Sequence, residues 1–341
     1  MPEGSPVLFA ELKQIPMPYD ISIVIPQYNE AESLPELLAW IDRVVVAQGW
    51  KAEVIVVDDG STDGSWAVIQ SLAGSSTVTL RGIRFQRNYG KSAALEVGFA
   101  ATQGNVVFTM DADLQDSPDE LPELYRMVVE EGYDLVSGWK KVRHDPKLSK
   151  NLPSKLFNAS VRGVTGIRLH DFNCGLKAYR PQVVKSVEIY GDMHRYIPVL
   201  AKGAGFTQIG EKPVTHYERK YGVTKFGWSR FINGFLDLLT VTFMQRYGKR
   251  PMHFFGCLGT LMILLGGVVT VWLVGIKVYS IARHIPYRDV VSQPLFFIGL
   301  TVAIFGLLFF LAGFLGELIA RSAPDRNRYN VAEKCGFEGA D

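Results

Sequence analysis

Two aspartates and a glutamine in the segment Asp111-Ala112-Asp113-Leu114-Gln115 are the residues best suited to chemistry. They directly follow an apolar run, NVVFTM, that has the length and composition of a β-strand. Side chains two positions apart in extended backbone point the same way, so Asp111 and Asp113 can share one site. Carboxylate and amide oxygens suit hard cations such as Mg²⁺ and Mn²⁺. The pattern therefore predicts that Asp111, Asp113 and Gln115 bind Mg²⁺ or Mn²⁺; the structural alternative is an acidic turn before the next helix.

Two other polar segments also begin where an apolar, β-branched run ends. PQYNE at 26–30 follows ISIVIP, and DDGSTDG at 58–64 follows EVIVVD. In a parallel sheet, ligands bind in the crevice outside the carboxyl ends of the strands. We therefore expect both segments to lie beside the aspartate pair, around one crevice.

The apolar runs that must position these segments alternate with helical patterns. Runs of strand length occupy residues 21–26, 53–58, 78–85, 105–110 and 133–138. Between the first two, apolar residues recur at the spacing of an amphipathic helix, at Leu34, Leu37, Leu38, Ile41 and Val45. Pro118 suits the first turn of another helix. The alternation predicts an α/β domain with a mostly parallel sheet and helices on both faces.

Composition and motifs exclude several classes of protein. The 341 residues carry 36 Lys and Arg against 34 Asp and Glu, and 48% are hydrophobic, which excludes a histone-like basic protein and a disordered chain. The 3 cysteines lie too far apart for a CxxC zinc site. No GxGxxG follows the first strand and no GxxxxGK[ST] occurs, so neither a dinucleotide-binding dehydrogenase nor a P-loop ATPase is expected.

Two long uncharged stretches lie in the C-terminal third of the chain. Residues 254–276 and 295–316 each exceed the roughly 20 residues that a helix needs to cross a bilayer. Basic residues are more numerous before the first stretch and after the second than between them. This distribution predicts that the outer ends of the two stretches face the cytoplasm. Residues 226–247 place aromatic and leucine side chains near helical spacing, which predicts a helix in the membrane interface. The alternative is an amphipathic helix docked on the preceding domain.

These features predict four parts. Residues 1–225 form a cytosolic catalytic domain, and residues 226–250 form a juxtamembrane amphipathic helix. Residues 251–320 form a two-helix transmembrane hairpin, and residues 321–341 form a cytosolic C-terminal tail. The protein is thus expected to be an integral membrane protein whose catalytic domain and termini are cytoplasmic.

Several segments together resemble a known family. PQYNE, VVDDGSTDGS, RNYGKSAAL and MDADLQDSP, in this order and spacing, resemble the family 2 glycosyltransferases of the GT-A fold. HDFNCGLKAYR, GDMHRYIP and RKYGVTKFG, followed by two spans, resemble more narrowly the polyprenyl-phosphate glycosyltransferases, such as dolichol-phosphate mannosyltransferases and bacterial undecaprenyl-phosphate glucosyltransferases. The resemblance covers roughly residues 18–322. It implies a nucleotide-sugar-binding GT-A domain and inverting, metal-dependent transfer of a sugar to undecaprenyl or dolichyl phosphate.

The resemblance also implies roles for residues at matching positions. The nucleotide-sugar would lie against Pro26, Tyr28, Glu30, Asp59, Lys91, Asp111 and Ala112. Lys91 would face the diphosphate, and Asp113 would act in catalysis by binding the metal ion. Without the resemblance, Tyr28 and Glu30 are also typical of a turn and a helix start, and Lys91 of a solvated helix face.

The segment that we expect to face the lipid acceptor carries an excess of positive charge. Between Lys140 and Arg168, eight Lys and Arg stand against one acid, Asp145. Such runs are commonly solvated or attract anionic lipid headgroups, and a chain with membrane spans favours a lipid phosphate. The family positions nearest that phosphate are Arg143, Lys155, Arg219 and Lys225.

The expected nucleophile is a phosphate oxygen of the lipid, which is largely ionised at neutral pH because the second pKa of a phosphate monoester is near 6. No strong general base is therefore required. If one assists, Asp171 is the candidate; its structural alternative is an acid that holds Lys177 or Arg180. The pattern favours UDP-glucose or a similar UDP-sugar and a bacterial inner membrane, although GDP-mannose fits the same pocket.

Two other functions share parts of the pattern. A processive polysaccharide synthase has the same fold and aspartate pair, but MQRY at 244–247 departs from its QxxRW motif. A catalytically inactive scaffold for a glycan-assembly complex is disfavoured by the retained Asp113, Lys91 and Arg219. The expected partners are the donor, the polyprenyl phosphate, a second copy through glycine-containing spans, a flippase and a downstream transferase; nucleic acid is not expected.

Overall fold

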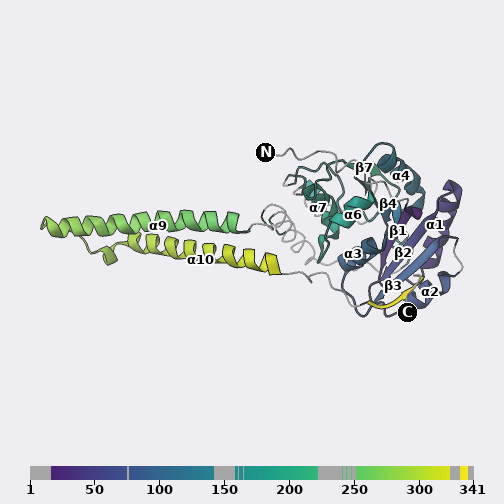
Figure 1. The fold of residues 1–341 in the computed structure, drawn as a ribbon, viewed down its shortest axis with the longest axis horizontal. Coiled ribbons are helices and arrows are strands. Elements are labelled where there is room, and N and C mark those ends of the chain that lie inside the picture. The colour runs from purple at the N-terminus through teal and green to yellow at the C-terminus, as the bar shows by residue number, and fades with distance from the viewer. Residues whose placement is uncertain are drawn as a thin grey trace, which may run out of the picture. The chain divides into compact units, whose positions relative to one another are not determined.

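The computed structural model describes residues 17–74, 77–141, 158–159, 161–163, 165–221, 240, 243, 247, 251–322 and 331–336, apart from the side chains of residues 317 and 320–322. The chain forms two compact units (Figure 1). The first comprises the residues up to Val241 together with those from Asn327 onward, and the second comprises Thr242–Arg326.

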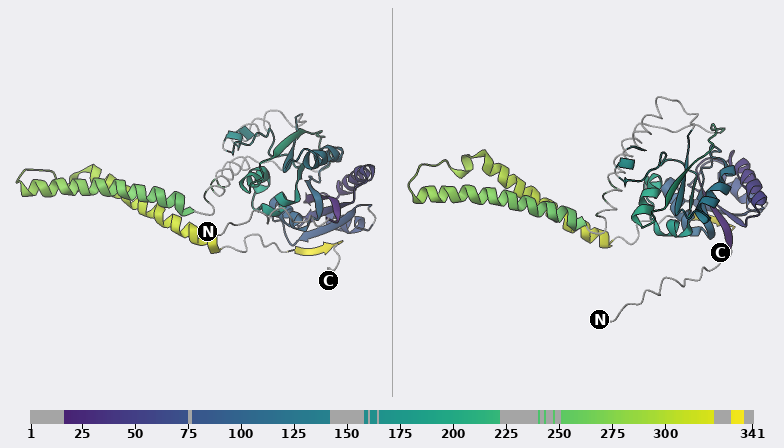
Figure 2. Two further views of the ribbon diagram at one scale, coloured as in Figure 1. Left: turned by 45° about the horizontal axis from the view of Figure 1, so that its top comes forward. Right: turned by 90° about the horizontal axis from the view of Figure 1, so that it is seen from above.

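An eight-stranded mixed sheet lies at the centre of the first unit, in the order β7-β5-β6-β4-β1-β2-β3-β8 (Figures 1 and 2). Its strands are β1 (Tyr19–Gln27), β2 (Ala52–Asp58), β3 (Thr79–Phe85), β4 (Gly104–Thr109), β5 (Leu135–Trp139), β6 (Lys177–Tyr179), β7 (Ile209–Pro213) and β8 (Val331–Cys335). Strands β4, β1, β2 and β3 pair in parallel, as do β5 and β7. Strands β6 and β8 run antiparallel to their neighbours. The predicted mostly parallel sheet is confirmed, and the five predicted strand runs coincide with β1 to β5.

Helices cover both faces of this sheet. They are α1 (Leu34–Gln48), α2 (Ser65–Leu72), α3 (Lys91–Ala101), α4 (Leu121–Val129), α6 (Pro181–Ser186) and α7 (Ile197–Gly203), with 3-10 turns at Pro118–Glu120 and Met193–Tyr196. Alternate residues of β1 point to opposite faces, as a strand requires. Ile23 packs in the cluster that contains Leu37 of α1, whereas Val24 packs with Phe99 of α3.

Helix α1 follows the predicted apolar stripe. Leu34, Leu37, Leu38, Ile41 and Val45 are all buried. The helix ends where Gly49 takes a left-handed conformation with φ 67°, which glycine adopts at little steric cost. The end of α1 thereby returns the chain to β2, so that the loops after β1 and β2 lie at the same edge of the sheet.

The C-terminal segment contributes a strand to the sheet of the first unit. The sequence pattern assigned residues 321–341 to a tail, but Val331–Cys335 pairs with β3 as strand β8. The indole nitrogen of Trp66 donates to Glu333 at 2.5 Å, and Arg84 lies 3.9 Å from the same carboxylate. The first domain therefore includes a strand from beyond the second long helix, and a boundary at residue 225 is incomplete.

The second unit is a pair of helices, α9 (Pro251–Ala282) and α10 (Pro294–Ser322), joined through a 3-10 turn at Val290–Ser292. Both contain an uncharged stretch long and apolar enough to cross a membrane, with mean hydropathies of 2.3 and 2.7. A Cβ on Gly266 would lie 2.3 Å from the carbonyl oxygen of Gly299, so glycine permits close packing of α9 on α10. Of the predicted interfacial helix at 226–247, only residues 240, 243 and 247 belong to the described part of the chain.

Candidate active site

The aspartate pair lies in the loop after β4, at the carboxyl end of the central strands. The backbone of Leu114, directly after Asp113, has φ 59°. A branched side chain rarely adopts this left-handed conformation, which costs on the order of 1 kcal/mol and is retained mainly in loops that the surrounding structure fixes. The loop is therefore held in a defined conformation.

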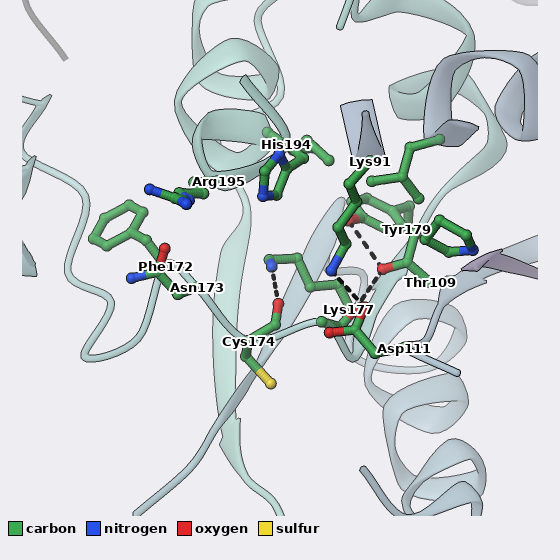
Figure 3. Close-up of a pocket in the computed structure, with 14 residues that line it drawn as sticks. Lys91, Thr109, Asp111, Phe172, Asn173, Cys174, Lys177, Tyr179, His194 and Arg195 are labelled. Carbon is green, nitrogen blue, oxygen red and sulfur yellow. Dashed lines mark hydrogen bonds and ion pairs between the residues drawn. The ribbon is translucent and has the colours of Figure 1, made fainter. Parts of the chain in front are cut away.

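Lys91 lies beside the first aspartate. It is the first residue of α3, and its ammonium forms an ion pair with Asp111 (Figure 3). The carboxylate of Asp59 accepts hydrogen bonds from the backbone amides of Tyr89 at 2.7 Å and Gly90 at 2.9 Å. The loop after β2 thus fixes the turn into α3, and this turn places Lys91 against the aspartate loop.

The segment after β1 joins the same crevice. The backbone amide of Asn29 donates to Ser61 Oγ at 2.9 Å, which ties this segment to the loop after β2. Pro26 lines the pocket, and Tyr28 is half-buried. The expected meeting of three polar segments at one edge of the sheet is confirmed, while the roles of Pro26, Tyr28 and Asp59 toward a nucleotide stay predictions.

Arg219 lies beside the second aspartate. Its guanidinium is 2.6 Å from Asp113 and 3.8 Å from Glu30. Burial and then the nearby Asp111 raise the pKa of Asp113, and Arg219 opposes this effect. Burial is also the largest cause of the raised pKa of Glu30. A residue expected near the lipid phosphate is therefore in direct contact with the aspartate pair, across 106 positions of sequence.

The aspartate pair fits a hard divalent cation. Both groups are carboxylates, and their mutual repulsion contributes to the raised pKa of Asp113, an effect that a cation between them would reverse. Among the described residues, no group of three or more His, Cys, Asp or Glu is arranged to hold a metal ion, and the proposed site rests on the two aspartates. The backbone of Gln115 is tied to Tyr217 at 2.8 Å, which holds Gln115 beside the pair.

Gly175 allows a second loop to approach Asp111. A Cβ at this position would lie 2.5 Å from Asp111 Oδ2 and 2.6 Å from its Cγ, closer than two non-bonded atoms can come. The hydroxyl of Thr109, the last residue of β4, donates to the Gly175 carbonyl at 2.8 Å. The segment HDFNCG is thus pressed against the aspartate loop. Its glycine was part of a quoted motif, but nothing in the sequence showed what it would touch.

A pocket opens beside the Lys91–Asp111 pair (Figure 3). Pro26 and Asp111 line it from the strand ends, and Lys177, His194 and Arg195 line it from the later half of the domain. The Ser92 hydroxyl lies 3.1 Å from His194 Nδ1 and accepts from the His194 backbone amide at 3.1 Å, which fixes the histidine at the pocket wall. The sequence had suggested Lys177 only as a structural partner of Asp171, and it had assigned no roles to His194 and Arg195.

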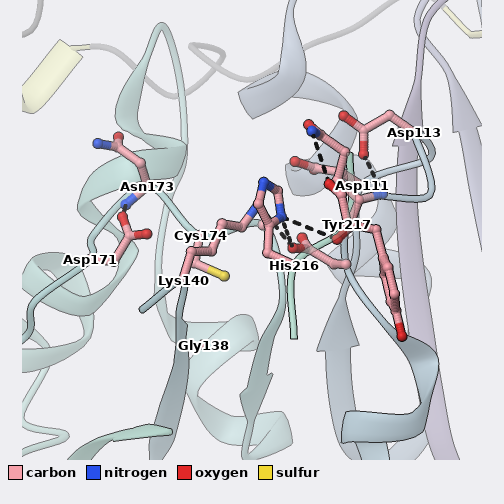
Figure 4. Close-up of polar contacts among 12 residues, drawn as sticks. Asp111, Asp113, Gly138, Lys140, Asp171, Asn173, Cys174, His216 and Tyr217 are labelled. Carbon is pink, nitrogen blue, oxygen red and sulfur yellow. Dashed lines mark hydrogen bonds and ion pairs between the residues drawn. The ribbon is translucent and has the colours of Figure 1, made fainter. Parts of the chain in front are cut away.

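A buried polar cluster surrounds Asp116, the residue that directly follows the 111–115 segment (Figure 4). Lys140 lies 2.9 Å from Asp116, and His216 Nδ1 lies 3.7 Å from the same carboxylate. Burial alone would raise the pKa of Asp116, but Lys140 and His216 outweigh it and hold that pKa well below its usual range. Lys140 was expected in the basic run that faces lipid. This part of the prediction is wrong, because Lys140 is paired inside the protein.

Asp171, the candidate base, is buried and is not among the residues that line the pocket. Its Oδ1 accepts the backbone amide of Asn173 at 3.0 Å, and its own amide donates to Glu211 at 3.0 Å. Arg180, one structural partner suggested by the sequence, pairs instead with Asp134 at 3.2 Å. The carboxylate therefore stabilises the turn at the start of the DFNCG segment, and a role as base stays a prediction.

Ala112 is buried between the two aspartates. Arg143, Lys155 and Lys225, the other residues expected near the lipid phosphate, lie outside the described residues. Of the four residues in that set, Arg219 is thus the one that can be placed.

The model of the family "Glycosyl transferase family 2" matches residues 22–187 of the chain. The chain is 35% identical over 304 residues to the dodecaprenyl-phosphate galacturonate synthase of Rhizobium johnstonii, across 89% of this chain and 88% of that protein. It is 34% identical over 315 residues to the undecaprenyl-phosphate 4-deoxy-4-formamido-L-arabinose transferase of Pseudomonas syringae pv. syringae, across 92% of this chain and 89% of the relative.

A solved structure of glucosyl-3-phosphoglycerate synthase from Mycobacterium tuberculosis, in complex with Mn²⁺, UDP-glucose and phosphoglyceric acid, shares the fold. Its TM-score is 0.51 at 20% identity, with 66% of this chain and 80% of that chain covered. The two relatives match about nine tenths of this chain, and the solved structure shares its fold. The chain is thus an enzyme of glycosyl transferase family 2, and it belongs among the polyprenyl-phosphate glycosyltransferases of that family.

Proposed function

We propose that this enzyme transfers a sugar from a UDP-sugar to undecaprenyl phosphate or a similar polyprenyl phosphate, with a divalent metal and with inversion at the anomeric carbon. The observation that carries the proposal is the pairing of each site aspartate with a cation, Asp111 with Lys91 and Asp113 with Arg219. Two carboxylates suit a metal, and two cations suit the phosphate oxygens of donor and acceptor. One site therefore holds groups for both the metal and its phosphate ligands.

Four described residues would each have a defined role in the proposed transfer. Asp111 and Asp113 would hold the Mg²⁺ or Mn²⁺ ion, which supplies Lewis-acid stabilisation of charge on the leaving diphosphate. Lys91, at the N-terminus of α3, would donate to the same diphosphate as its negative charge grows. Arg219 would orient the attacking phosphate. Because that phosphate is already ionised at neutral pH, Asp171 is not required to remove a proton.

The identity of the transferred sugar is less well defined than the reaction class. The relatives are named for galacturonate and for 4-deoxy-4-formamido-L-arabinose, and UDP-glucose is the donor in the solved complex that shares the fold. The UDP-glucose preferred from sequence remains one candidate among UDP-sugars, and GDP-mannose remains another nucleotide to test.

We place the catalytic unit on the cytoplasmic face of a bacterial inner membrane. The support is the pair of apolar helices α9 and α10 together with the sheet strand β8, which follows them in sequence. The first unit contains chain from before α9 and from after α10, so we propose that both ends of the helix pair face the cytoplasm. A homo-oligomer, a flippase and a downstream transferase that uses the lipid-linked sugar remain proposed partners.

The test is sugar transfer by the purified full-length protein in detergent to a short-chain polyprenyl phosphate. Labelled UDP- and GDP-sugars are supplied separately, with Mg²⁺ or Mn²⁺ and with EDTA. A single-sugar lipid product that disappears with EDTA supports the proposal. A growing polymer would favour a processive synthase. Binding of nucleotide-sugars without transfer from any donor would favour a catalytically inactive scaffold.

A further inference from the structure

Lys177 is a buried cation in the wall of the pocket. It is the first residue of β6, and only 4% of its surface is exposed. Its ammonium donates to the backbone carbonyl of Cys174. In Figure 3 the ammonium points to the side of the pocket lined by His194 and Arg195.

Cationic side chains outnumber acidic ones among the described residues that line this pocket. Among the described residues that line it, Lys91, Lys177 and Arg195 are cationic, and Asp111 is acidic. The carboxylate of Asp111 is engaged by Lys91. The Cys174 thiol does not supply a negative charge either, because burial raises its pKa to about 12. Among the described lining residues, Lys177 is therefore a second lysine beside the Lys91–Asp111 pair, and its hydrogen bond is to a neutral carbonyl.

Burying an ammonium costs free energy unless hydrogen bonds and an opposite charge compensate for the lost water. Burial and the positive charge of Lys91 lower the pKa of Lys177, although Asp171 and Asp111 oppose this effect. A carbonyl oxygen satisfies one of the three N–H donors of an ammonium. An anionic group on a bound substrate would supply the missing charge and further acceptors.

The diphosphate of the donor has its own cations. It must lie at Asp111 and Asp113, where Lys91 and Arg219 are in contact with the aspartates. Lys177 also lines this pocket, and its ammonium lies on the side toward Asn173 and His194 (Figure 3). A group at this position belongs to the sugar that the diphosphate carries into the pocket.

We propose that Lys177 binds the carboxylate of a uronic acid and so selects a nucleotide-linked uronic acid as the donor. This inference rests on the proposed function and narrows its substrate class. A hydroxymethyl group, as in glucose, would accept one hydrogen bond but would leave the buried charge uncompensated. A carboxylate forms a charge-assisted hydrogen bond, which is about twice as strong as a neutral one.

The test compares donors that differ only at carbon 6. Transfer to a short-chain polyprenyl phosphate is measured with UDP-galacturonate against UDP-galactose, and with UDP-glucuronate against UDP-glucose. The wild-type enzyme is expected to prefer one of the uronates. In Lys177→Gln, the ratio of kcat/KM for the preferred uronate to kcat/KM for its neutral partner should fall by about 10- to 100-fold, the range for one hydrogen bond to a charged group.

Lys185→Gln is the matched control. Lys185 also donates to backbone carbonyls, those of Phe99 at 2.6 Å and Ala100 at 2.9 Å, but it does not line the pocket. Its substitution should leave the donor ratio unchanged. Lys177→Arg keeps the positive charge and should retain more of the uronate preference than Lys177→Gln, which separates the charge from effects on packing.

The outcomes separate the two proposals. A wild-type enzyme that prefers a neutral donor overturns the uronate assignment and leaves the proposed function intact. An equal loss for both donors in Lys177→Gln, or a raised KM for the polyprenyl phosphate alone, also overturns it. Failure to transfer from any donor overturns the proposed function itself.

Discussion

Replacing Gly175 with alanine tests how closely the DFNCG segment must approach the aspartate loop. The added Cβ would lie 2.5 Å from Asp111 Oδ2, whereas ordinary contacts begin at 3.4 Å. Either Asp111 or the Gly175 backbone must therefore move by about 1 Å. The Thr109 hydrogen bond to the Gly175 carbonyl opposes movement of the backbone, so we expect the carboxylate to be displaced.

A displacement of this size in catalytic machinery costs about 100-fold in rate, equivalent to about 2.7 kcal/mol in the activation free energy. Overpacking costs about 1–3 kcal/mol in folding stability. We therefore expect kcat/KM of Gly175→Ala to fall about 100-fold, the metal concentration at half-maximal activity to rise, and thermal unfolding to occur at a lower temperature in a still-folded protein.

The assay is initial-rate sugar transfer by the full-length enzyme over a range of Mg²⁺ or Mn²⁺ concentrations, with thermal unfolding of the same samples. Gly74→Ala is the control, because Gly74 has open space around its Cβ position. If Gly175→Ala kept wild-type activity and metal dependence, the close contact with Asp111 would have no functional role, and the reasoning would be refuted.

Four further outcomes follow from the contacts. Asp113→Asn should lower transfer by about 100- to 1000-fold with membrane insertion unchanged, measured against the exposed control Glu130→Gln. Activity within tenfold of wild type would disprove the metal assignment. Lys140→Met leaves Asp116 buried without its 2.9 Å partner, so thermal or denaturant unfolding should show a loss of about 3–5 kcal/mol, and adding Asp116→Asn should restore much of it; no loss would contradict the pairing. The pKa of Glu120 is low because Lys212 and Thr215 outweigh the effect of burial, so its stabilisation is complete above pH ~4.5 and declines as the pH falls through the lower folded-state value. The difference in Tm between wild type and Glu120→Gln should accordingly shrink from pH ~7 to pH ~4, and a constant difference would argue against this origin. Deleting residues 331–341 removes β8 and the Trp66–Glu333 hydrogen bond, exposes the edge of β3 and should lower Tm and promote aggregation in detergent; an unchanged Tm would mean that β8 contributes little to the sheet.

Local patterns predicted the architecture well because each depends on residues that are close in sequence. The apolar runs that became β1 to β5 had the right length, and the stripe from Leu34 to Val45 had helical spacing. The two apolar stretches likewise needed only length and lack of charge to be predicted as spans, and α9 and α10 contain them. The short strand β8 carries Glu333 and Lys334 among its residues, and such a strand has no strong local signal.

The site was predicted in part. Asp111 and Asp113 could be selected because polar residues at the ends of parallel strands meet at one edge, whereas Lys91 and Glu30 were selected through the resemblance to the family. Lys140 was placed incorrectly, because a run of basic residues suggests a solvated surface, and only the packing of β5 beside the aspartate loop shows that this lysine pairs with Asp116.

The sequence by itself determined the α/β domain, the paired apolar helices, the aspartate pair and the resemblance to the family, because these depend on residue type and short spacing. Tertiary structure alone decided which charges meet: Asp113 with Arg219, 106 positions apart, and Lys91 with Asp111. It also placed Lys177 inside the pocket and Gly175 against Asp111. The physical reason is that contacts between distant segments depend on how the whole sheet and its loops pack, and no local pattern carries that information.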